Sequence, residues 1–401
     1  MTSLSLLLWI ALAIALQLGL FLAFRLWHHR QAYLQLKQGS DEPAIAADSP
    51  RHERAAWTGF RSFRITRRRT EDTNRQICSF YLVPEDGAPL PAFLPGQFLT
   101  FRLSLPTPLV RCYSLSDAPG SDHYRISVKR VPSGRSSNFF HDAIQPGATL
   151  EVRAPSGHFH LEHGDSPVVL IAGGIGITPM TSMLNWCCEH QPEREVWLFY
   201  GVRNSAELAF GDHLQDIARK NPNFHLRLCF SNPQPDELAG RDFHHPGRID
   251  INLLRMELPL KPYHYFLCGP APMLESLVPA LEAWGVPDSR IHFEAFGPAS
   301  IKRSSAPRSA ATAENAEPIP VTFAKSGKLV EWTPQSGSLL ELAEAAGIAI
   351  DSGCRAGGCG TCQTTIRSGE ITSRQPPDYD PDPGSCLMCI SIPKTPLTLE
   401  L

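Results

Sequence analysis

The sequence lacks a surplus of either charge, since 37 Lys and Arg residues stand against 40 Asp and Glu residues and leave a formal net charge of -3. A chain without a broad basic field is a poor match for nucleic acid, so no nucleic-acid partner is expected. Global disorder is also not expected, because 42% of the residues are hydrophobic and 19% are charged. At 401 residues the chain is too long for one ordinary core, and its length favours about three domains.

Charged residues are absent from Ser3 to Phe24, an apolar stretch that as one helix covers the roughly 30 Å hydrocarbon core of a bilayer. A cleaved signal peptide is the alternative, but its basic n-region, shorter apolar run and small-residue cleavage site are not evident. Arg25 and Arg30 follow the run, and the positive-inside tendency puts that side in the cytoplasm. We therefore expect residues 1–30 to form a single-pass transmembrane anchor in the lipid bilayer, with residues 31–55 as a polar tether.

The rest of the chain divides by its pattern of apolar residues. Short β-type runs separated by turn residues predict an antiparallel β-barrel over residues 56–163. Apolar strands alternate with helical stretches over residues 164–298, which indicates an α/β domain with a parallel sheet. Residues 299–317 are rich in Ala, Ser and charge, as is typical of a linker. A hairpin-like pair, a helical stretch and a cysteine loop make up residues 318–401.

Cysteine is spread unevenly, because five of the eleven lie between Cys354 and Cys389. The other six lie in apolar runs, where a thiol usually behaves as a small buried hydrophobe. The spacing of Cys354, Cys359 and Cys362 is C-x₄-C-x₂-C, which is typical of plant-type [2Fe–2S] proteins, and thiolates suit iron. The fourth ligand is Cys386 or Cys389, which lie three residues apart in an expected strand and should face opposite sides. A structural zinc site is the alternative, but zinc ribbons commonly use paired C-x₂-C knuckles.

The sequence also lacks a G-x-G-x-x-G fingerprint. In its place, AGGIGITP at residues 172–179 follows an apolar strand and precedes a helix, which is the context of a Gly-rich phosphate loop. The segment CFSNPQPDELAG, after the third strand of this domain, has no basic residue that could bind a 2′-phosphate. NADH is therefore favoured over NADPH, and Arg203 is the one residue that argues otherwise.

Seven segments occur in an order that resembles a known superfamily: RCYSLSD, YRISVKR, GRSSNFFHD, VRAPSGHF, IAGGIGITPM, YFLCGP and IHFEAFGP. Over residues 56–298 they look like the ferredoxin–NADP⁺ reductase superfamily and are most similar to the reductase half of flavohaemoglobins. Residues 318–401 separately resemble plant-type ferredoxins, which implies an α+β β-grasp domain. The L-x-C-x-x-x-P ending of those domains is matched by Leu387, Cys389 and Pro393, so the resemblance implies Cys389 as the fourth iron ligand.

The resemblance implies an FAD site on the barrel. It assigns Arg111 to the flavin phosphate, Tyr113 to the side of the isoalloxazine and Ser114 to the reactive N5, roles that suit a guanidinium, an aromatic ring and a hydroxyl. The turn of Gly134 and Ser137 would meet the pyrophosphate at a helix start. The remaining cofactor-binding residues expected in the barrel come from YRISVKR, and they are Val128 and Lys129.

The resemblance also implies a nicotinamide site where two domains meet. The expected dinucleotide contacts come from the Gly-rich loop and from the end of a later strand, and they are Gly173, Gly174, Gly176, Thr178, Pro179, Cys268, Gly269 and Pro270. Glu294 would lie near the hydride-transfer site, and Phe296 would cover the flavin. The residues expected to act in catalysis are Ser114, Thr178, Cys268 and Glu294.

The module order predicts an electron path. Nicotinamide delivers electrons in pairs and a [2Fe–2S] centre takes them singly, whereas flavin can do both. We expect NADH to reduce FAD, FAD to reduce the cluster, and the cluster to reduce a redox protein or a membrane oxygenase or desaturase. A respiratory NADH:quinone-type subunit and a redox-sensing membrane adaptor are the alternatives. The 55 residues ahead of the barrel are too few for a globin domain, so nitric oxide dioxygenation by this chain alone is not expected.

Overall fold

The computed structural model describes residues 17, 56–57, 59–106, 109–120, 122–162, 164–296, 317–350, 352–353, 355, 357–374, 377, 379 and 381–401. The expected membrane anchor apart from Gln17, the whole expected tether, the expected linker apart from Glu317 and the predicted iron ligand Cys354 lie outside these residues. Within the described part of the chain, no helix is both long and apolar enough to span a bilayer.

The first domain is an antiparallel barrel with the strand order β4-β3-β6-β1-β2-β5. An antiparallel bridge between Leu115 and Ile126 brings the two edge strands together. Along β1, Phe63 and Ile65 point into the core, because alternate residues of a strand face opposite sides. The elements are β1 (Arg61–Thr70), β2 (Ile77–Pro84), β3 (Phe98–Leu103), β4 (Leu109–Ser114), β5 (Tyr124–Lys129), α2 (Arg135–Ala143) and β6 (Thr149–Ser156).

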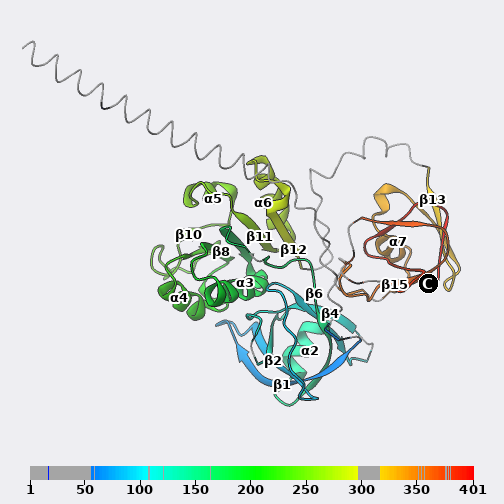
Figure 1. Cartoon of the computed structure of the whole chain (residues 1–401), viewed down its shortest axis with the longest axis horizontal. Helices are drawn as coiled ribbons and strands as arrows, with labels where there is room; N and C mark the ends of the chain where they lie inside the picture. Colours follow the sequence, from blue (N-terminus) through cyan, green and yellow to red (C-terminus); the bar gives the residue numbers. More distant parts are fainter. Residues whose placement is uncertain are drawn as a thin grey trace, which may run out of the picture.

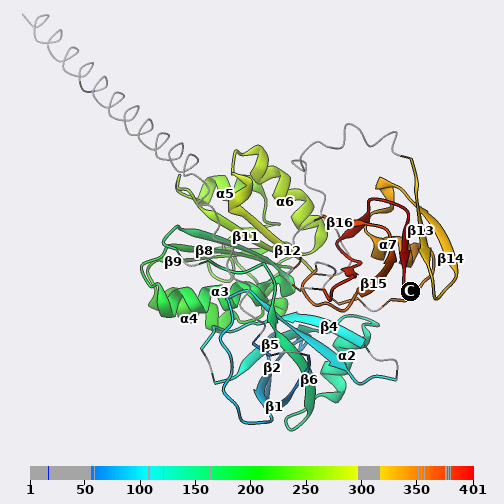
Figure 2. The same cartoon turned by 45° about the vertical axis from the view of Figure 1, so that its right-hand side comes forward.

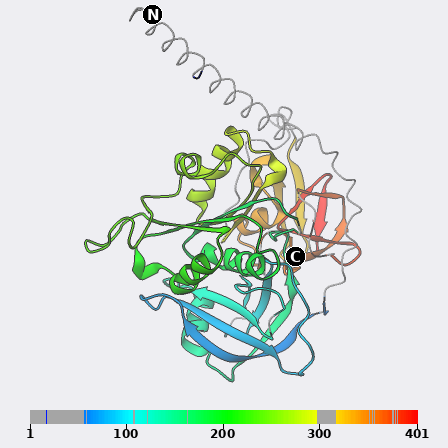
Figure 3. The ribbon, with the colours of Figure 1, turned by 60° about the vertical axis from the view of Figure 1, so that its left-hand side comes forward.

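The second domain is a parallel six-stranded sheet, as the alternation of strands and helices predicts, and it lies against the barrel (Figure 3). Its strand order is β10-β9-β8-β7-β11-β12. The strands are β7 (Val168–Gly173), β8 (Val196–Val202), β9 (Phe224–Phe230), β10 (His245–Pro246), β11 (His264–Gly269) and β12 (Ile291–Ala295). The helices are α3 (Ile177–His190), α4 (Gly211–Lys220), α5 (Ile251–Glu257) and α6 (Ala271–Ala283).

The two faces of this sheet have separate cores. On β7, Leu170 packs in the core that α3 and α4 cover, while the next residue, Ile171, packs in the core that α5 and α6 cover. The chain leaves β7 toward β8 on one side and has β11 on the other side, so the C-terminal ends of β7 and β11 form the switch point of the sheet. Ligands of open α/β sheets bind at such a point.

The third domain has a five-stranded sheet of order β14-β13-β19-β15-β17, with β13 and β19 parallel. The expected hairpin and helix are confirmed, and Ser338 and Glu341 form a capping box at the start of the helix. Figures 1 and 2 show this domain, in orange and red, beside β4 of the barrel. Its elements are β13 (Ile319–Phe323), β14 (Lys328–Trp332), α7 (Leu339–Ala345), β15 (Gln363–Ser368), β16 (Ile371–Ser373), β17 (Ser385–Leu387), β18 (Ser391–Pro393) and β19 (Leu397–Leu399).

Candidate active site and cluster site

Strand β4 carries the R-x-Y-S motif at the rim of the barrel. The Tyr113 ring packs edge-on against Phe140 of α2 with 5.0 Å between ring centroids. Its hydroxyl is hydrogen-bonded to the hydroxyl of Ser136, with 2.6 Å between the oxygens. Burial raises the pKa of Tyr113 to about 12, so the phenol stays protonated at neutral pH and can donate a hydrogen bond. Ser114 follows it as a buried residue.

The start of α2 offers backbone amides to an anion. Gly134 is the N-cap residue and no side chain caps the helix there. Ser137 stabilises the turn, because its Oγ accepts a hydrogen bond from the Val131 amide (3.1 Å) and donates one to the Gly134 carbonyl (3.3 Å). A helix N-terminus whose amides lack a side-chain cap is a suitable phosphate site. This turn therefore fits the phosphate end of a flavin nucleotide.

Three residues predicted for the flavin site have other contacts. Arg111 is exposed and donates hydrogen bonds to the carbonyls of Val110 (2.7 Å) and Ser352 (3.3 Å), the latter in the third domain. The Val128 side chain belongs to the barrel core, and its carbonyl accepts a hydrogen bond from Nε2 of His141. Lys129 is half-buried at the end of β5. Their roles toward flavin stay predictions.

The Gly-rich loop packs very closely against the end of β11. A Cβ atom on Gly176 would collide with the Cys268 carbonyl, and one on Gly173 would lie 2.7 Å from the Pro270 ring. Only glycine permits this approach of two backbones. The predicted residues Gly174 and Gly176 form one 3₁₀ turn, and Thr178 and Pro179 lie buried in the first turn of α3. The loop is thus shaped for a dinucleotide that lies on main-chain atoms.

Cys268 and Glu294 are neighbours across parallel strands β11 and β12. Burial raises the pKa of the Cys268 thiol well above its ordinary value, and the Glu294 carboxylate raises it further. The thiol is therefore neutral at physiological pH. Phe296 has an exposed side chain two residues after Glu294. Cys268, Gly269 and Pro270 lie at the same end of the sheet as the Gly-rich loop, so the structure brings the predicted nicotinamide residues together.

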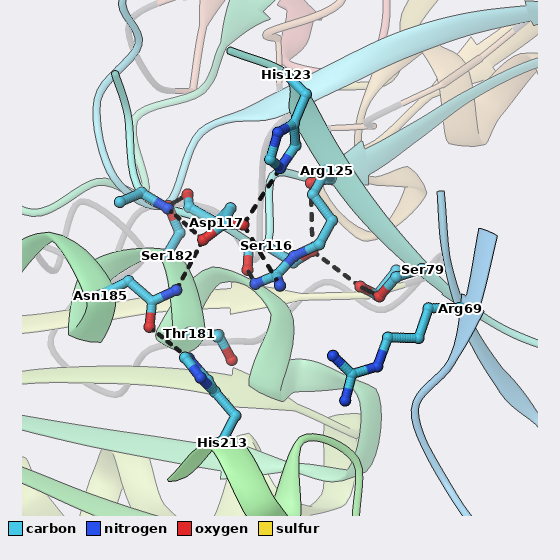
Figure 4. Close-up of polar contacts among 12 residues, drawn as sticks. Arg69, Ser79, Ser116, Asp117, His123, Arg125, Thr181, Ser182, Asn185 and His213 are labelled. Carbon is cyan, nitrogen blue, oxygen red and sulfur yellow. Dashed lines mark hydrogen bonds and ion pairs between the residues drawn. The ribbon is translucent and has the colours of Figure 1, made fainter. Parts of the chain in front are cut away.

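A buried polar network joins the barrel to the parallel-sheet domain, as Figure 4 shows. Asp117, three residues after Ser114, accepts a hydrogen bond from Nδ2 of Asn185 on α3 (2.8 Å) and lies 3.4 Å from Nη1 of Arg125 on β5. Burial raises the pKa of Asp117, but His123, whose Nε2 lies 3.6 Å from the carboxylate, the charge of Arg125 and the bond from Asn185 more than offset this and lower it to about 2. Asp117 is therefore ionised, and it contacts Arg125 of the barrel and Asn185 of the parallel-sheet domain.

The same network sets the distance between the two predicted cofactor sites. The Ser182 hydroxyl on α3 donates to the Asp117 carbonyl over 2.7 Å. Thr178 lies one helical turn before Ser182, about 5.4 Å along the axis, and Ser114 lies three residues before Asp117. The flavin motif and the nicotinamide loop are therefore fixed close to each other.

The described cysteines of the C-terminal domain differ in their surroundings. Cys359 and Cys362 are 3% exposed. The thiol of Cys389 is hydrogen-bonded to Cys362 and lowers the pKa of Cys362 against the effect of burial. Cys386 is also buried, and burial raises its pKa to about 12. Among the described residues no group of three or more metal-binding side chains is arranged around one point, and Cys354 is not among them.

The expected strand through Cys386 and Cys389 is wrong. Strand β17 ends at Leu387, and Cys389 lies in a turn in which the Ile390 amide donates to the Leu387 carbonyl. The two cysteines therefore do not alternate across one strand. What distinguishes them is the turn itself, which brings Cys389 to Cys362. This placement supports Cys389 as a ligand, and thiols are the donors that an iron–sulfur cluster takes.

Each of the three domains matches a known protein family. Residues 63–161 match the oxidoreductase FAD-binding domain, residues 170–278 the oxidoreductase NAD-binding domain, and residues 322–394 the 2Fe–2S iron–sulfur cluster binding domain. The flavohemoprotein of Bordetella pertussis is 37% identical over 281 residues, which are 67% of this chain and 69% of that protein. This chain belongs to the flavohemoprotein-related oxidoreductases of the ferredoxin reductase type.

The reductase matches only part of the length of these flavohemoproteins. The flavohemoprotein of Halalkalibacterium halodurans is 38% identical over 259 residues, 62% of each protein, so the chain spans less than two thirds of that relative. A solved phthalate dioxygenase reductase, whose structure is described as modular for electron transfer from pyridine nucleotides to [2Fe–2S], is 29% identical with a TM-score of 0.53. That similarity covers 86% of the reductase and 98% of the solved chain. The cofactors of the reductase are FAD, NAD(H) and a [2Fe–2S] cluster.

Sequence reasoning missed three functional contacts of the reductase. Ser136 binds the Tyr113 hydroxyl, Asp117 ties the flavin motif to α3, and Arg153 on β6 donates a hydrogen bond to the Cys359 carbonyl. Ser136 and Asp117 lie within motifs that the sequence shows, so proximity to those motifs was a usable signal. Arg153 likewise lies within such a motif, VRAPSGHF, on a strand whose buried residues alternate with more exposed ones.

Proposed function

We propose that the reductase takes electrons from NADH and passes them through FAD and the [2Fe–2S] cluster to an oxygenase or a similar outside acceptor. When bound, FAD accepts a hydride from NADH and releases the electrons singly to the cluster. The protein supports this chemistry by the position of its side chains around the two cofactors. The Tyr113 phenol and Ser114 offer hydrogen-bond donors at the flavin edge, and the neutral Cys268 thiol beside Glu294 lines the nicotinamide side without adding charge of its own.

One observation carries the proposal. Strand β4 presents Tyr113 toward α2 and the phosphate turn, while its neighbour in sequence, Cys112, faces the loop of the C-terminal domain that holds the predicted iron ligands. Adjacent residues of a strand point to opposite sides. A flavin on one side of β4 and a cluster on the other would be separated by about one strand, which suits single-electron transfer.

The contacts of Arg203 support NADH as the donor. Arg203 is the residue that could bind the 2′-phosphate of NADPH, but it forms an ion pair with Glu207 four residues on. Glu237 adds a second carboxylate here, since it accepts a hydrogen bond from the Ser205 amide (2.8 Å). These carboxylates would repel a dianionic phosphate. We expect kcat/KM for NADH to exceed that for NADPH by at least about tenfold, a difference of roughly 1.4 kcal/mol.

The acceptor and the location belong to the same proposal. A dioxygenase partner is suggested by the name of the phthalate dioxygenase reductase, whose length the chain nearly covers. The uncharged stretch from Ser3 to Phe24 supports attachment to a membrane, with the catalytic domains on the cytoplasmic side. The full-length protein should then stay with membranes after alkaline carbonate washing and require detergent for release. Release by carbonate would rule out a spanning anchor.

The central test is anaerobic reduction of the purified protein with NADH. Flavin absorbance should bleach first, and a rhombic paramagnetic signal from the reduced cluster should follow. Cys389→Ser should abolish the cluster signal and leave flavin bleaching intact, whereas Cys386→Ser should keep both. Slow turnover with cytochrome c in spite of both signals would favour the redox-sensing adaptor.

A further inference from the structure

Three side chains form a row on the outer face of the barrel. Thr100 on β3 is in register with Cys112 on β4 and with Arg153 on β6. The Thr100 hydroxyl and the Cys112 sulfur are 3.4 Å apart. The neighbours Val152 and Ala154 are buried, and Val152 lies in the barrel core, so Arg153 points outward. This row is the part of the barrel that faces the C-terminal domain.

The row contacts the loop that carries the predicted iron ligands. Nη1 of Arg153 donates a hydrogen bond to the carbonyl of Cys359, and the Ser156 hydroxyl donates to the carbonyl of Gly358 over 3.2 Å. A Cβ atom on Gly353 would lie 3.4 Å from the Cys112 sulfur and 2.9 Å from the Cys359 sulfur. The Cys112 sulfur would thus be at van der Waals distance from such an atom, so the loop lies against β4 here, and the close contact with Cys359 lies within the loop itself.

Two aromatic rings orient the Arg153 guanidinium. Its Cζ atom lies 4.7 Å from the centroid of Phe60, in the barrel domain, and 5.6 Å from that of Tyr379, in the C-terminal domain. A guanidinium is planar and stacks on aromatic faces, so these rings limit its rotation while its N–H groups stay available. Arg153 thus contacts both domains by hydrogen bond and by stacking.

We propose that Arg153 is the positioning residue that holds the cluster loop against the flavin barrel and so sets the rate of flavin-to-cluster electron transfer. The inference rests on the proposed electron path. Transfer between two sites depends steeply on their separation, and a displacement of about 1 Å can cost a large factor in rate. Arg153 acts through the main chain of a ligand residue rather than through a cofactor, so it affects the geometry of transfer and leaves hydride transfer unchanged.

The test compares Arg153→Ala, Arg153→Lys and a matched control, Arg102→Ala, in the holoenzyme. Arg102 stacks on the same Phe60 ring at 3.8 Å, but its ion pair is with Glu151 of the barrel. Stopped-flow absorbance would follow flavin bleaching by NADH and then cluster reduction. Hydrogen exchange of the amides of residues 357–360 would report contact of the loop with the barrel independently of turnover.

We expect Arg153→Ala to slow cluster reduction by about tenfold or more, because a charge-assisted hydrogen bond is lost. Amide exchange in residues 357–360 should rise, and flavin bleaching should stay within twofold. Arg153→Lys should recover part of the rate, since it keeps the charge but not the planar stacking. If Arg153→Ala does not load its cluster, Arg153→Lys decides by the same two readouts.

Wild-type cluster reduction and wild-type amide exchange in Arg153→Ala or in Arg153→Lys would overturn the assignment, as would an equal effect of Arg102→Ala. Failure of the electron path itself looks different. In that case the wild-type protein bleaches its flavin without reducing the cluster, and the exchange of residues 357–360 still tests whether Arg153 holds the loop.

Discussion

The barrel meets the parallel-sheet domain and the ferredoxin-type domain through different chemistry. Toward the parallel sheet, the ionised Asp117 carboxylate accepts a hydrogen bond from the Asn185 side chain, and the Asp117 carbonyl accepts one from the Ser182 hydroxyl. Arg125 and His123 lie beside the same carboxylate from within the barrel. Toward the ferredoxin-type domain, Arg111, Arg153 and Ser156 all donate to main-chain carbonyls. The first junction depends on specific partners on each side. The junction with the ferredoxin-type domain depends instead on where the main chain of the cluster loop runs, because its acceptors are main-chain carbonyls.

This difference matches what each junction has to do. Hydride transfer needs the flavin and the nicotinamide in one fixed geometry. The Asn185 amide on α3 donates to the Asp117 carboxylate, and an ion pair with Arg125 holds that carboxylate in place within the barrel. Electron transfer to the cluster needs the cluster loop held at a set distance from the flavin. At this junction the acceptors are neutral main-chain carbonyls, and the bonds from Arg111 and Arg153 are charge-assisted by their donors.

The largest expected effect is at the first junction. Asp117→Ala would leave Arg125, whose side chain is 9% exposed, buried beside His123 without its carboxylate. Removing one partner of a buried pair typically costs about 3 kcal/mol or more. Urea unfolding followed by flavin fluorescence should show this loss. Asp122→Ala is the matched control, because Asp122 also pairs with His123 but its side chain is 97% exposed, and it should change little.

At the second junction the strongest change is steric. Gly353→Ala puts a methyl group 2.9 Å from the Cys359 sulfur, in the part of the loop that lies beside Cys112 of β4, and overpacking of this kind costs about 1–3 kcal/mol. Flavin-to-cluster transfer should slow while flavin bleaching by NADH stays normal. Gly164→Ala is the control, since a Cβ there meets nothing within 4 Å. Equal rates in the two variants would show that the cluster loop is not held tightly.

A smaller loss is expected from Ser156→Ala. The variant removes one hydrogen bond to the Gly358 carbonyl, worth about 1 kcal/mol, and so should slow cluster reduction by up to about fivefold. Thermal unfolding of the flavin-binding part should be unchanged. Ser62→Ala, at an exposed position of β1, gives the baseline. A drop in unfolding temperature instead of in transfer rate would mean that Ser156 supports the barrel rather than the junction.

The smallest effect concerns pH. The nearby Asp117 carboxylate raises the pKa of His123 above its ordinary 6.5, against the effect of burial. Stability from a raised histidine pKa is fully present below pH 6.5 and is lost as pH rises through the folded value. His123→Gln should therefore destabilise more at pH 6 than at pH 9, by less than about 1 kcal/mol because the ring is partly solvated. Equal destabilisation at both pH values would argue against a charged His123.

Much of the fold followed from local patterns. The alternation of apolar and polar residues along Arg61–Thr70 predicted a barrel strand. The apolar run before the Gly-rich loop predicted β7. The cysteine spacing and the order of motifs indicated the cofactors that the comparisons show. Strand alternation and the C-x₄-C-x₂-C spacing are local, because each depends on neighbours within about ten residues, whereas the order of motifs extends over residues 56–298.

The contacts between domains could not be read from the sequence. Asp117 and Asn185 are 68 residues apart, and Arg153 and Cys359 are 206 apart. Such pairs depend on how folded domains meet, and no period or spacing encodes that. The turn at Cys389 was missed for a related reason. A run of apolar residues from Leu387 to Ile390 is compatible with a strand, and only tertiary packing bends it.

The carbonyl contacts of the cluster loop also bear on how such proteins can be recombined. Every residue type carries a main-chain carbonyl, so a barrel that binds carbonyls places little demand on the side chains of the loop that it accepts. A chimera that joins this barrel to another ferredoxin domain needs a compatible loop path and a small residue at the site of Gly353. Exchange of the nicotinamide domain would demand much more, because Asn185, Ser182 and the start of α3 would have to be inherited together.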